Sequence, residues 1–256
     1  MTTGFALAER FRAGETVYTV WCGLAAPIVV ETIAREGFVS VALDQQHGLY
    51  DAATTQAGIA AVRLAGAAAM VRVPVGDFAG VSRMLDFGAE AVVMPMINTV
   101  ADARLFAAAA KYPPLGERSW GPMRALTLAG ISDAAAYLRE ANAATLTLAM
   151  IETSTALDNA DAIAAVPGID GLFIGPADLA ITLTNGKSME MTPPVEQAMD
   201  RIGDAARKAG KIAGAYCQDG ARAKALAARG FNFVAIGGDL GFLRAGTAAM
   251  LKAIKG

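Results

Sequence analysis

Short apolar runs and longer amphipathic stretches alternate along the whole chain. The apolar runs occupy residues 17–21, 38–44, 67–72, 91–95, 145–151, 171–175, 211–216 and 232–237. Continuous apolar runs of this length are typical of strands that a parallel sheet buries on both faces. Apolar residues spaced three and four apart predict helices at 51–64, 77–87, 99–110, 133–142, 195–209, 219–229 and 239–255.

The alternation predicts the fold class. Eight strand–helix units in a chain of 256 residues match the length of one (β/α)8 barrel. We therefore predict an α/β protein with a single (β/α)8 TIM barrel domain over residues 1–256. A doubly wound open sheet is the competing architecture, but segment 21–26 (WCGLAA), after the first strand, lacks its glycine fingerprint. Two long connections, 111–130 and 183–194, are predicted as lid or binding loops, with a plain surface loop as the alternative for the second.

Composition narrows the class of protein. A hydrophobic fraction of 54% with 18% charged residues supports a large core and excludes a disordered chain. The net charge is −2 with dispersed basic residues, which predicts neither a nucleic-acid nor a membrane partner. Cys22 and Cys217 are far apart and are expected to be free thiols in a reducing compartment. The N-terminal segment has no apolar signal core, so the predicted location is cytoplasmic.

Residues capable of chemistry or binding stand where several predicted strands end. They are Trp21, Asp44, Arg72, Glu152 and Asp178. The carboxyl ends of all strands in a barrel open on one face, where active sites are built. Each residue alone has a structural explanation, such as a core tryptophan, a capping salt bridge or an acidic first helical turn. Five of them on one face indicate a functional site.

The only histidine of the chain, His47, lies just after the second predicted strand. Histidine titrates near neutral pH, and the Asp44 carboxylate could orient it and favour its protonated form. A helix-capping aspartate followed by an ordinary loop histidine is the alternative, and the local pattern by itself slightly favours that alternative. The other strand ends favour an acid–base pair of Asp44 and His47.

Two carboxylates predict a metal site. Glu152 and Asp178 follow predicted strands five and six, and adjacent strands lie about 4.8 Å apart. Such carboxylates repel unless a cation or a proton lies between them. Oxygen ligands favour Mg2+ or Mn2+ and also admit Co2+, whereas one histidine excludes a three-histidine zinc site. No lysine stands at the carboxyl end of a predicted strand, which disfavours covalent lysine catalysis.

Segment 175–178 (GPAD) predicts a helix start whose amides at Ala177 and Asp178 would bind a carboxylate. Together with a metal and Arg72, these amides suit a 2-oxo acid. The metal would hold its carboxylate and keto oxygen, and Arg72 would stabilise the enolate oxygen. A phosphate-ligand binding barrel that uses segment 235–239 after the eighth strand is a rival class. A glycine pair at a tight turn is the commoner explanation of that segment.

Five segments, in their order and spacing, resemble the HpcH/HpaI aldolase family and span nearly the whole chain. They are 43–48 (LDQQHG), 71–74 (VRVP), 113–118 (PPLGER), 151–153 (IET) and 173–179 (FIGPADL). The last two together are the most specific.

The resemblance implies a metal-dependent class II pyruvate aldolase. Such a carbon–carbon lyase reversibly cleaves 4-hydroxy-2-oxo acids to pyruvate, or hydroxypyruvate, and an aldehyde through a metal-bound enolate. It implies Glu152 and Asp178 as ligands of a divalent ion, Arg72 at the keto oxygen, and Asp44 with His47 as the acid–base dyad. It further implies a homo-hexamer, a trimer of dimers, whose C-terminal helix is exchanged between subunits. The alternative within this chemistry is an enolate-forming lyase of the citrate lyase type, which would need a site for an acyl thioester.

The chain departs from the family pattern at three positions. Gln46 replaces an acidic residue, Met150 replaces a glutamine and Tyr216 replaces an aliphatic residue. Strand parity predicts that Met150 points into the barrel beneath the metal. Tyr216, near the end of the seventh strand, is predicted to bind substrate with Trp21 and to shape the pocket for the aldehyde. These changes leave the choice of donor and acceptor open.

Overall fold

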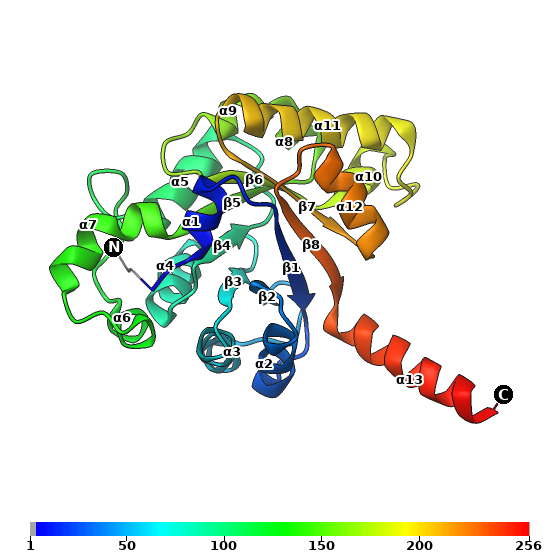
Figure 1. The fold of residues 1–256 in the computed structure, drawn as a ribbon. Helices are drawn as coiled ribbons and strands as arrows, with labels where there is room; N and C mark the ends of the chain where they lie inside the picture. The colour runs from blue at the N-terminus through cyan, green and yellow to red at the C-terminus, as the bar shows by residue number, and fades with distance from the viewer. Residues whose placement is uncertain (1–3, 256) are drawn as a thin grey trace.

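The computed structural model describes residues 4–255, and eight parallel strands close into a barrel in sequence order. The (β/α)8 fold predicted from the alternation is thus confirmed (Figure 1). The strands are β1 (Val17–Cys22), β2 (Ser40–Asp44), β3 (Ala68–Arg72), β4 (Ala91–Met94), β5 (Leu146–Ile151), β6 (Gly171–Ile174), β7 (Ile212–Cys217) and β8 (Phe233–Gly238).

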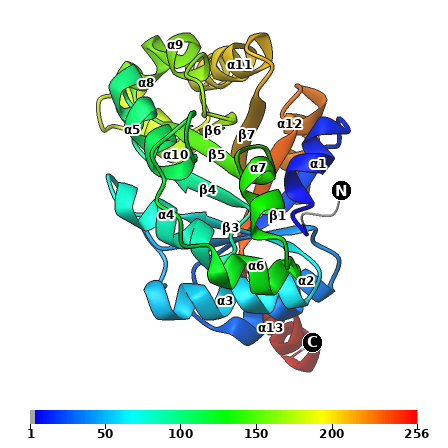
Figure 2. The same ribbon diagram turned by 90° about the vertical axis from the view of Figure 1, so that its left-hand side faces the viewer.

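Helices surround the barrel and connect its strands (Figure 2). The seven predicted helices are present, within a few residues of their expected bounds, as α3 (Ala52–Leu64), α4 (Phe78–Phe87), α5 (Val100–Ala110), α7 (Ala134–Ala144), α11 (Pro193–Lys208), α12 (Gly220–Ala228) and α13 (Asp239–Lys255). The helix start predicted at 175–178 begins α10 (Pro176–Leu183). The structure adds α1 (Leu7–Arg12), α2 (Pro27–Arg35), α6 (Met123–Ala129), α8 (Ser154–Asp158) and α9 (Ala160–Ala164). No helix within residues 4–255 has both the length and the apolar character needed to cross a bilayer.

One expectation about the loops needs correction. Segment 111–130 is not a continuous loop, because its second half forms α6. The first half is also anchored, since the Arg118 side chain is buried and donates to Asp86 at 2.6 Å. Segment 183–194 does connect α10 to α11 without a helix of its own.

Two apolar layers stabilise the barrel. Alternate strand residues point inward and form an inner core that includes Met70, Leu148 and Phe173. The intervening residues point outward and pack under the surrounding helices. Helix α1 covers the amino ends of the strands, where Leu7 belongs to the inner core and the Phe11 ring meets the Phe233 ring edge-on at 5.2 Å. With the amino end covered, the carboxyl end is the face available for a site.

Helix α13 departs from this compact arrangement. It starts at the end of β8 and extends away from the barrel, so that the C-terminus lies far from the other helices (Figure 1). Apart from Asp239, its described residues are exposed. The exposed apolar side chains are Leu240, Phe242, Leu243, Met250, Leu251 and Ile254.

Candidate active site

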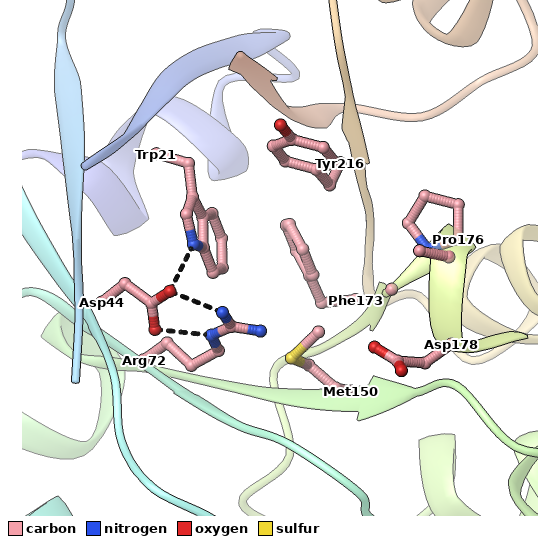
Figure 3. Close-up of a pocket in the computed structure, with 10 residues that line it drawn as sticks. Trp21, Asp44, Arg72, Met150, Phe173, Pro176, Asp178 and Tyr216 are labelled. Carbon is pink, nitrogen blue, oxygen red and sulfur yellow. Dashed lines mark hydrogen bonds and ion pairs between the residues drawn. The ribbon is translucent and has the colours of Figure 1, made fainter. Parts of the chain in front are cut away.

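A cavity of about 250 Å3 opens at the carboxyl ends of the strands (Figure 3). Its walls come from loops and strands far apart in the sequence. The lining residues are Trp21, Asp44, Arg72, Met150, Phe173, Gly175, Pro176, Ala177, Asp178 and Tyr216. The structure therefore brings together most of the residues that the sequence predicted at the strand ends.

Asp44 and Arg72 form the first edge of the cavity. They are direct partners in the β2–β3 register, so the two side chains emerge side by side at the strand ends. Asp44 accepts two hydrogen bonds from Arg72, from Nε at 2.8 Å and from Nη2 at 2.6 Å. Burial would raise the pKa of Asp44, but the hydrogen bonds and charge of Arg72 outweigh it and hold that pKa below its usual value. Asp44 is thus a stable anion paired with a planar cation.

This pairing orients the arginine. Asp44 occupies the Nε and Nη2 edge of the guanidinium, and Arg72 stacks over the Trp21 ring with its carbon 4.9 Å from the ring centroid. Trp21 also donates to Asp44 from Nε1 at 3.2 Å. Within residues 4–255 no acceptor is found for Nη1 of Arg72, which retains its two N–H groups for a ligand in the cavity.

Two carboxylates stand at the opposite edge. Asp178 lines the cavity, whereas Glu152 is not a lining residue itself and lies next to Gly175, which is. Glu152 follows β5 and is buried, whereas Asp178 is exposed in the first turn of α10. Burial raises the pKa of Glu152 and the Asp178 charge adds to this effect, while the Met96 amide and Arg72 oppose it. Neither carboxylate forms an ion pair with any residue in the described part of the chain. Two carboxyl groups in this arrangement favour a bound cation.

A glycine leaves room for the Glu152 carboxylate beside the cavity. Gly175 ends the turn between β6 and α10, and a Cβ at this position would overlap the Glu152 carboxylate and lie 3.0 Å from the Met150 methyl carbon. Met150 belongs to the inner core and lines the cavity, as strand parity predicted.

The predicted helix start is confirmed. Gly175 is the N-cap of α10 and supplies no side-chain cap, and Pro176 occupies the first helical position. The first described helical bond runs from the Leu179 amide to the Gly175 carbonyl at 3.0 Å. The amides of Ala177 and Asp178 precede it and lie at the cavity wall, where a helix N-terminus attracts anions.

Aromatic rings form the remaining wall. Trp21 stacks on Phe173 with centroids 5.5 Å apart, and Tyr216 meets Trp21 edge-on at 6.2 Å. Phe173 has room because it faces Gly214 of β7, where a Cβ would lie 2.6 Å from the ring. The sequence reasoning did not single out Phe173. Its alternation with Gly171 and Gly175 on one side of β6 is the signal that could have found it.

His47 lies outside this set of lining residues. Its side chain is exposed, and no hydrogen bond of the imidazole is found among residues 4–255. Its backbone amide donates weakly to Asp44 at 3.4 Å. The Asp44 carboxylate instead accepts from Arg72, Trp21 and backbone amides. The predicted pair of the Asp44 carboxylate with the His47 imidazole is not formed among the described residues. The acid–base role of His47 stays a prediction.

The geometry supports neither covalent lysine catalysis nor a phosphate site after β8. The one fully buried lysine of the described chain, Lys111, lies at the amino ends of β5 and β6, where it donates to the Thr145 carbonyl at 2.6 Å and to Asp170 at 2.7 Å. The turn after β8 already contains an anion, because Asp239 accepts from the amides of Gly23 at 3.1 Å and Leu24 at 2.8 Å. A carboxylate at this turn disfavours phosphate binding.

The donor set fits a magnesium-like ion. Within residues 4–255 no group of three or more histidine, cysteine, aspartate or glutamate side chains is arranged to hold a metal. Mg2+ in enzymes is commonly bound by one or two carboxylates, with waters and substrate oxygens completing its shell. Glu152 and Asp178 would supply that pair, and the cavity beside them leaves space for the other ligands.

Comparison with known proteins agrees with this geometry. The HpcH/HpaI aldolase/citrate lyase family model matches residues 18–245. The chain is 37% identical over 233 residues to the hydroxypyruvate/pyruvate aldolase of Rhizorhabdus wittichii, with 91% of each chain covered. It is 34% identical over 253 residues to the 5-keto-4-deoxy-D-glucarate aldolase of Klebsiella pneumoniae, covering 96% of this chain and 97% of that protein.

A solved structure is also similar. The crystal structure of an HpcH/HpaI aldolase/citrate lyase family protein from Burkholderia cenocepacia superposes with a TM-score of 0.89 and 30% identity, covering 98% of this chain and 100% of that chain. The barrel and its aldolase relatives together define a carbon–carbon lyase built on a (β/α)8 fold. The chain belongs to the HpcH/HpaI aldolase/citrate lyase family.

Proposed function

We propose that this protein is a divalent-metal-dependent class II aldolase that reversibly cleaves 4-hydroxy-2-oxo acids to pyruvate, or hydroxypyruvate, and an aldehyde. The observation that supports it most is the arrangement around one cavity, with the Arg72 guanidinium on one side and two carboxylates on the other. Asp178 lines the cavity, and Glu152 lies next to the lining residue Gly175. A 2-oxo acid presents an anionic carboxylate next to a keto oxygen, and the two edges match these groups.

The carboxylates Glu152 and Asp178 would hold Mg2+, Mn2+ or Co2+. When bound, such an ion polarises the keto group and lowers the energy of negative charge on its oxygen. Within the chain, the amides of Ala177 and Asp178 would bind the substrate carboxylate. The Nη1 group of Arg72 would donate to the keto oxygen as it gains charge, with Asp44 fixing the guanidinium plane.

Proton transfer is assigned to His47. In the synthetic direction it would remove a C3 proton of the oxo acid, directly or through a water molecule, and in cleavage it would return one. Its side chain is exposed on the loop after β2, three residues beyond Asp44, which lines the cavity. In cleavage, the C4 hydroxyl would pass its proton to His47, directly or through water, as the C3–C4 bond breaks to give the aldehyde and the enolate. His47 would then return that proton to C3 of the enolate.

The aromatic wall would receive the aldehyde. Trp21, Phe173 and Tyr216 present ring faces and edges, which favour apolar contacts over recognition of a charged tail. We therefore expect aldehydes with apolar or aromatic substituents to be accepted better than aldehydes that carry a carboxylate.

A donor–acceptor screen tests this proposal. Pyruvate and hydroxypyruvate would be combined with short, hydroxylated, aromatic and carboxylate-bearing aldehydes, and the 4-hydroxy-2-oxo acid products would be measured by chromatography. Product formation with free oxo acids is expected. Activity confined to acyl thioesters would contradict the proposal and favour a lyase of the citrate lyase type.

We also propose that the protein assembles as a homo-hexamer, a trimer of dimers, through exchange of α13. The support is the exposed apolar side of this helix, including Leu243 at 60% and Ile254 at 81% exposure, which a monomer would leave in water. Light scattering after gel filtration should give a hexamer for the wild type and smaller species for a Leu243→Glu, Leu251→Glu variant. A monomeric wild type at micromolar concentration would contradict the assembly.

A further inference from the structure

The loop between β4 and α5, residues 95–99, contributes no carboxylate to the site but lies against the end of β5. The Ile97 amide donates to the Met150 carbonyl at 3.2 Å. The Met96 amide donates to Oε1 of Glu152 at 2.8 Å. The loop therefore binds both the strand end and the carboxylate that follows it, while no hydrogen bond to Oε2 of Glu152 is found among residues 4–255.

The backbone of Met96 has an unusual conformation. Its φ is 55°, in the left-handed region that residues other than glycine and asparagine seldom adopt. Its side chain is 38% exposed, so burial in the core does not account for this conformation. Such strain persists only where the surroundings fix it, and at functional sites it often serves the geometry. Here the conformation directs a backbone N–H to Glu152.

Asn98 fixes this turn. Its Nδ2 donates to the Met96 carbonyl at 3.0 Å, and its Oδ1 accepts from the hydroxyl of Thr153, the residue after Glu152. The Asn98 carbonyl accepts from Nδ2 of Asn159 at 2.9 Å. One side chain thus links the strained turn to the segment that carries the carboxylate.

We propose that Met96 and Asn98 are positioning residues for Glu152, and that the loop holds Oε1 so that Oε2 is oriented toward a divalent ion. This inference rests on the proposed function, because it takes Glu152 as a metal ligand. Losing an outer partner of a metal ligand typically weakens metal affinity by about 10–100-fold. The same loss is therefore expected when the turn is disrupted, even though neither residue touches the ion.

Mn2+ binding without substrate tests the inference. Chelator-treated, metal-free enzyme would be titrated with Mn2+, and free Mn2+ would be measured by electron paramagnetic resonance. Met96→Val should weaken binding about tenfold, because a β-branched residue resists positive φ. Met96→Gly should bind like the wild type, since glycine adopts this φ and keeps the amide. Asn98→Ala should weaken binding about 10–100-fold.

Thr99→Ala is the matched control. Thr99 is the exposed N-cap of α5, where its hydroxyl accepts from the Asp102 amide at 3.2 Å. The substitution therefore destabilises the same loop and helix without touching Met96 or Glu152. It should lower the melting temperature but change the Mn2+ dissociation constant by less than about threefold. If the role of Asn98 were purely structural, Asn98→Ala and Thr99→Ala would change Mn2+ binding to the same extent.

The outcomes separate this inference from the proposed function. Glu152→Gln serves as the reference that should abolish tight Mn2+ binding. If it does, but Met96→Val and Asn98→Ala bind like the wild type, the positioning role is wrong and the metal site stands. If Thr99→Ala weakens binding as much as Asn98→Ala, the positioning role is also wrong. A wild type that binds no Mn2+ would overturn the metal site and the positioning role together. If Met96→Val fails to fold, the comparison of Mn2+ affinity between Asn98→Ala and Thr99→Ala decides the question.

Discussion

The two edges of the cavity contain acidic groups in opposite electrostatic states. On the β2–β3 edge, Asp44 is bound by the Arg72 guanidinium, which lowers its pKa. On the β5–β6 edge, burial and the neighbouring Asp178 raise the pKa of Glu152, and no cationic side chain of the described residues pairs with it. The charges of the first edge are paired within the protein, whereas the second is the edge at which we propose that a cation binds. In the proposed function, Arg72 is therefore the electrophilic group that the protein supplies, and the metal is the other.

The largest predicted effect concerns His47, which belongs to neither edge. Replacing it with asparagine should lower the exchange of the pyruvate methyl protons with deuterated water by about 10²–10⁴-fold. Metal and pyruvate affinity should be retained, because the side chain lines neither edge. Proton NMR measures the exchange directly.

An unchanged exchange rate with lost aldol cleavage would assign His47 to the aldehyde half of the reaction. Asp44→Asn should also slow the exchange. The structure gives a reason that the sequence did not, since this substitution removes the charge that orients Arg72.

A substitution at Arg72 tests the β2–β3 edge. Arg72→Lys keeps the charge but loses the planar fork that serves Asp44 and the cavity together. We expect kcat for aldol cleavage to fall by about 10²–10³-fold, the usual loss when a donor to a developing oxyanion is removed. Circular dichroism should show an intact fold. Turnover close to that of the wild type would make Arg72 a structural residue.

Tyr216 tests the aromatic wall between the two edges and should give the smallest effect. Tyr216→Leu removes the ring that meets Trp21 edge-on. The ratio of kcat/KM for an aromatic over a small aliphatic aldehyde should fall by about tenfold, within the range of apolar pocket contacts. Exchange of the donor protons should change little. Tyr216→Phe, which keeps the ring, is the control, and an unaltered ranking in Tyr216→Leu would remove Tyr216 from the acceptor site.

The two edges also differ in how much of each could be predicted from the sequence. The placement of the charged residues on one face was predictable, because a barrel brings the carboxyl ends of its apolar strands together. Asp44 and Arg72 end such strands, and Glu152 follows one directly. Asp178 was predictable from the helix start after β6. The pairing of Asp44 with Arg72 was not predictable from the sequence. Register determines that Asp44 lies opposite Arg72, and register depends on the closed barrel rather than on local pattern.

Hydrogen bonds from backbone groups to site residues could not be predicted from the sequence either. Nothing in the residue type of Met96 predicts a positive φ, and its amide is the group that binds Glu152. The short helices α1 and α6 were missed in the sequence pattern because six or seven residues give few helical repeats. The expected order of strands and longer helices is confirmed, because eight continuous apolar runs divide the chain and mark where the helices lie.

The measurement that tests the central claim most directly is cleavage of a 4-hydroxy-2-oxo acid by enzyme stripped of metal with a chelator. The account predicts that release of pyruvate or hydroxypyruvate is lost in the stripped enzyme and restored by Mg2+, Mn2+ or Co2+. It also predicts that these ions restore nothing in a Glu152→Gln, Asp178→Asn variant that folds normally. Full activity of the wild type without metal, or full restoration in that variant, would contradict a metal site at these two carboxylates.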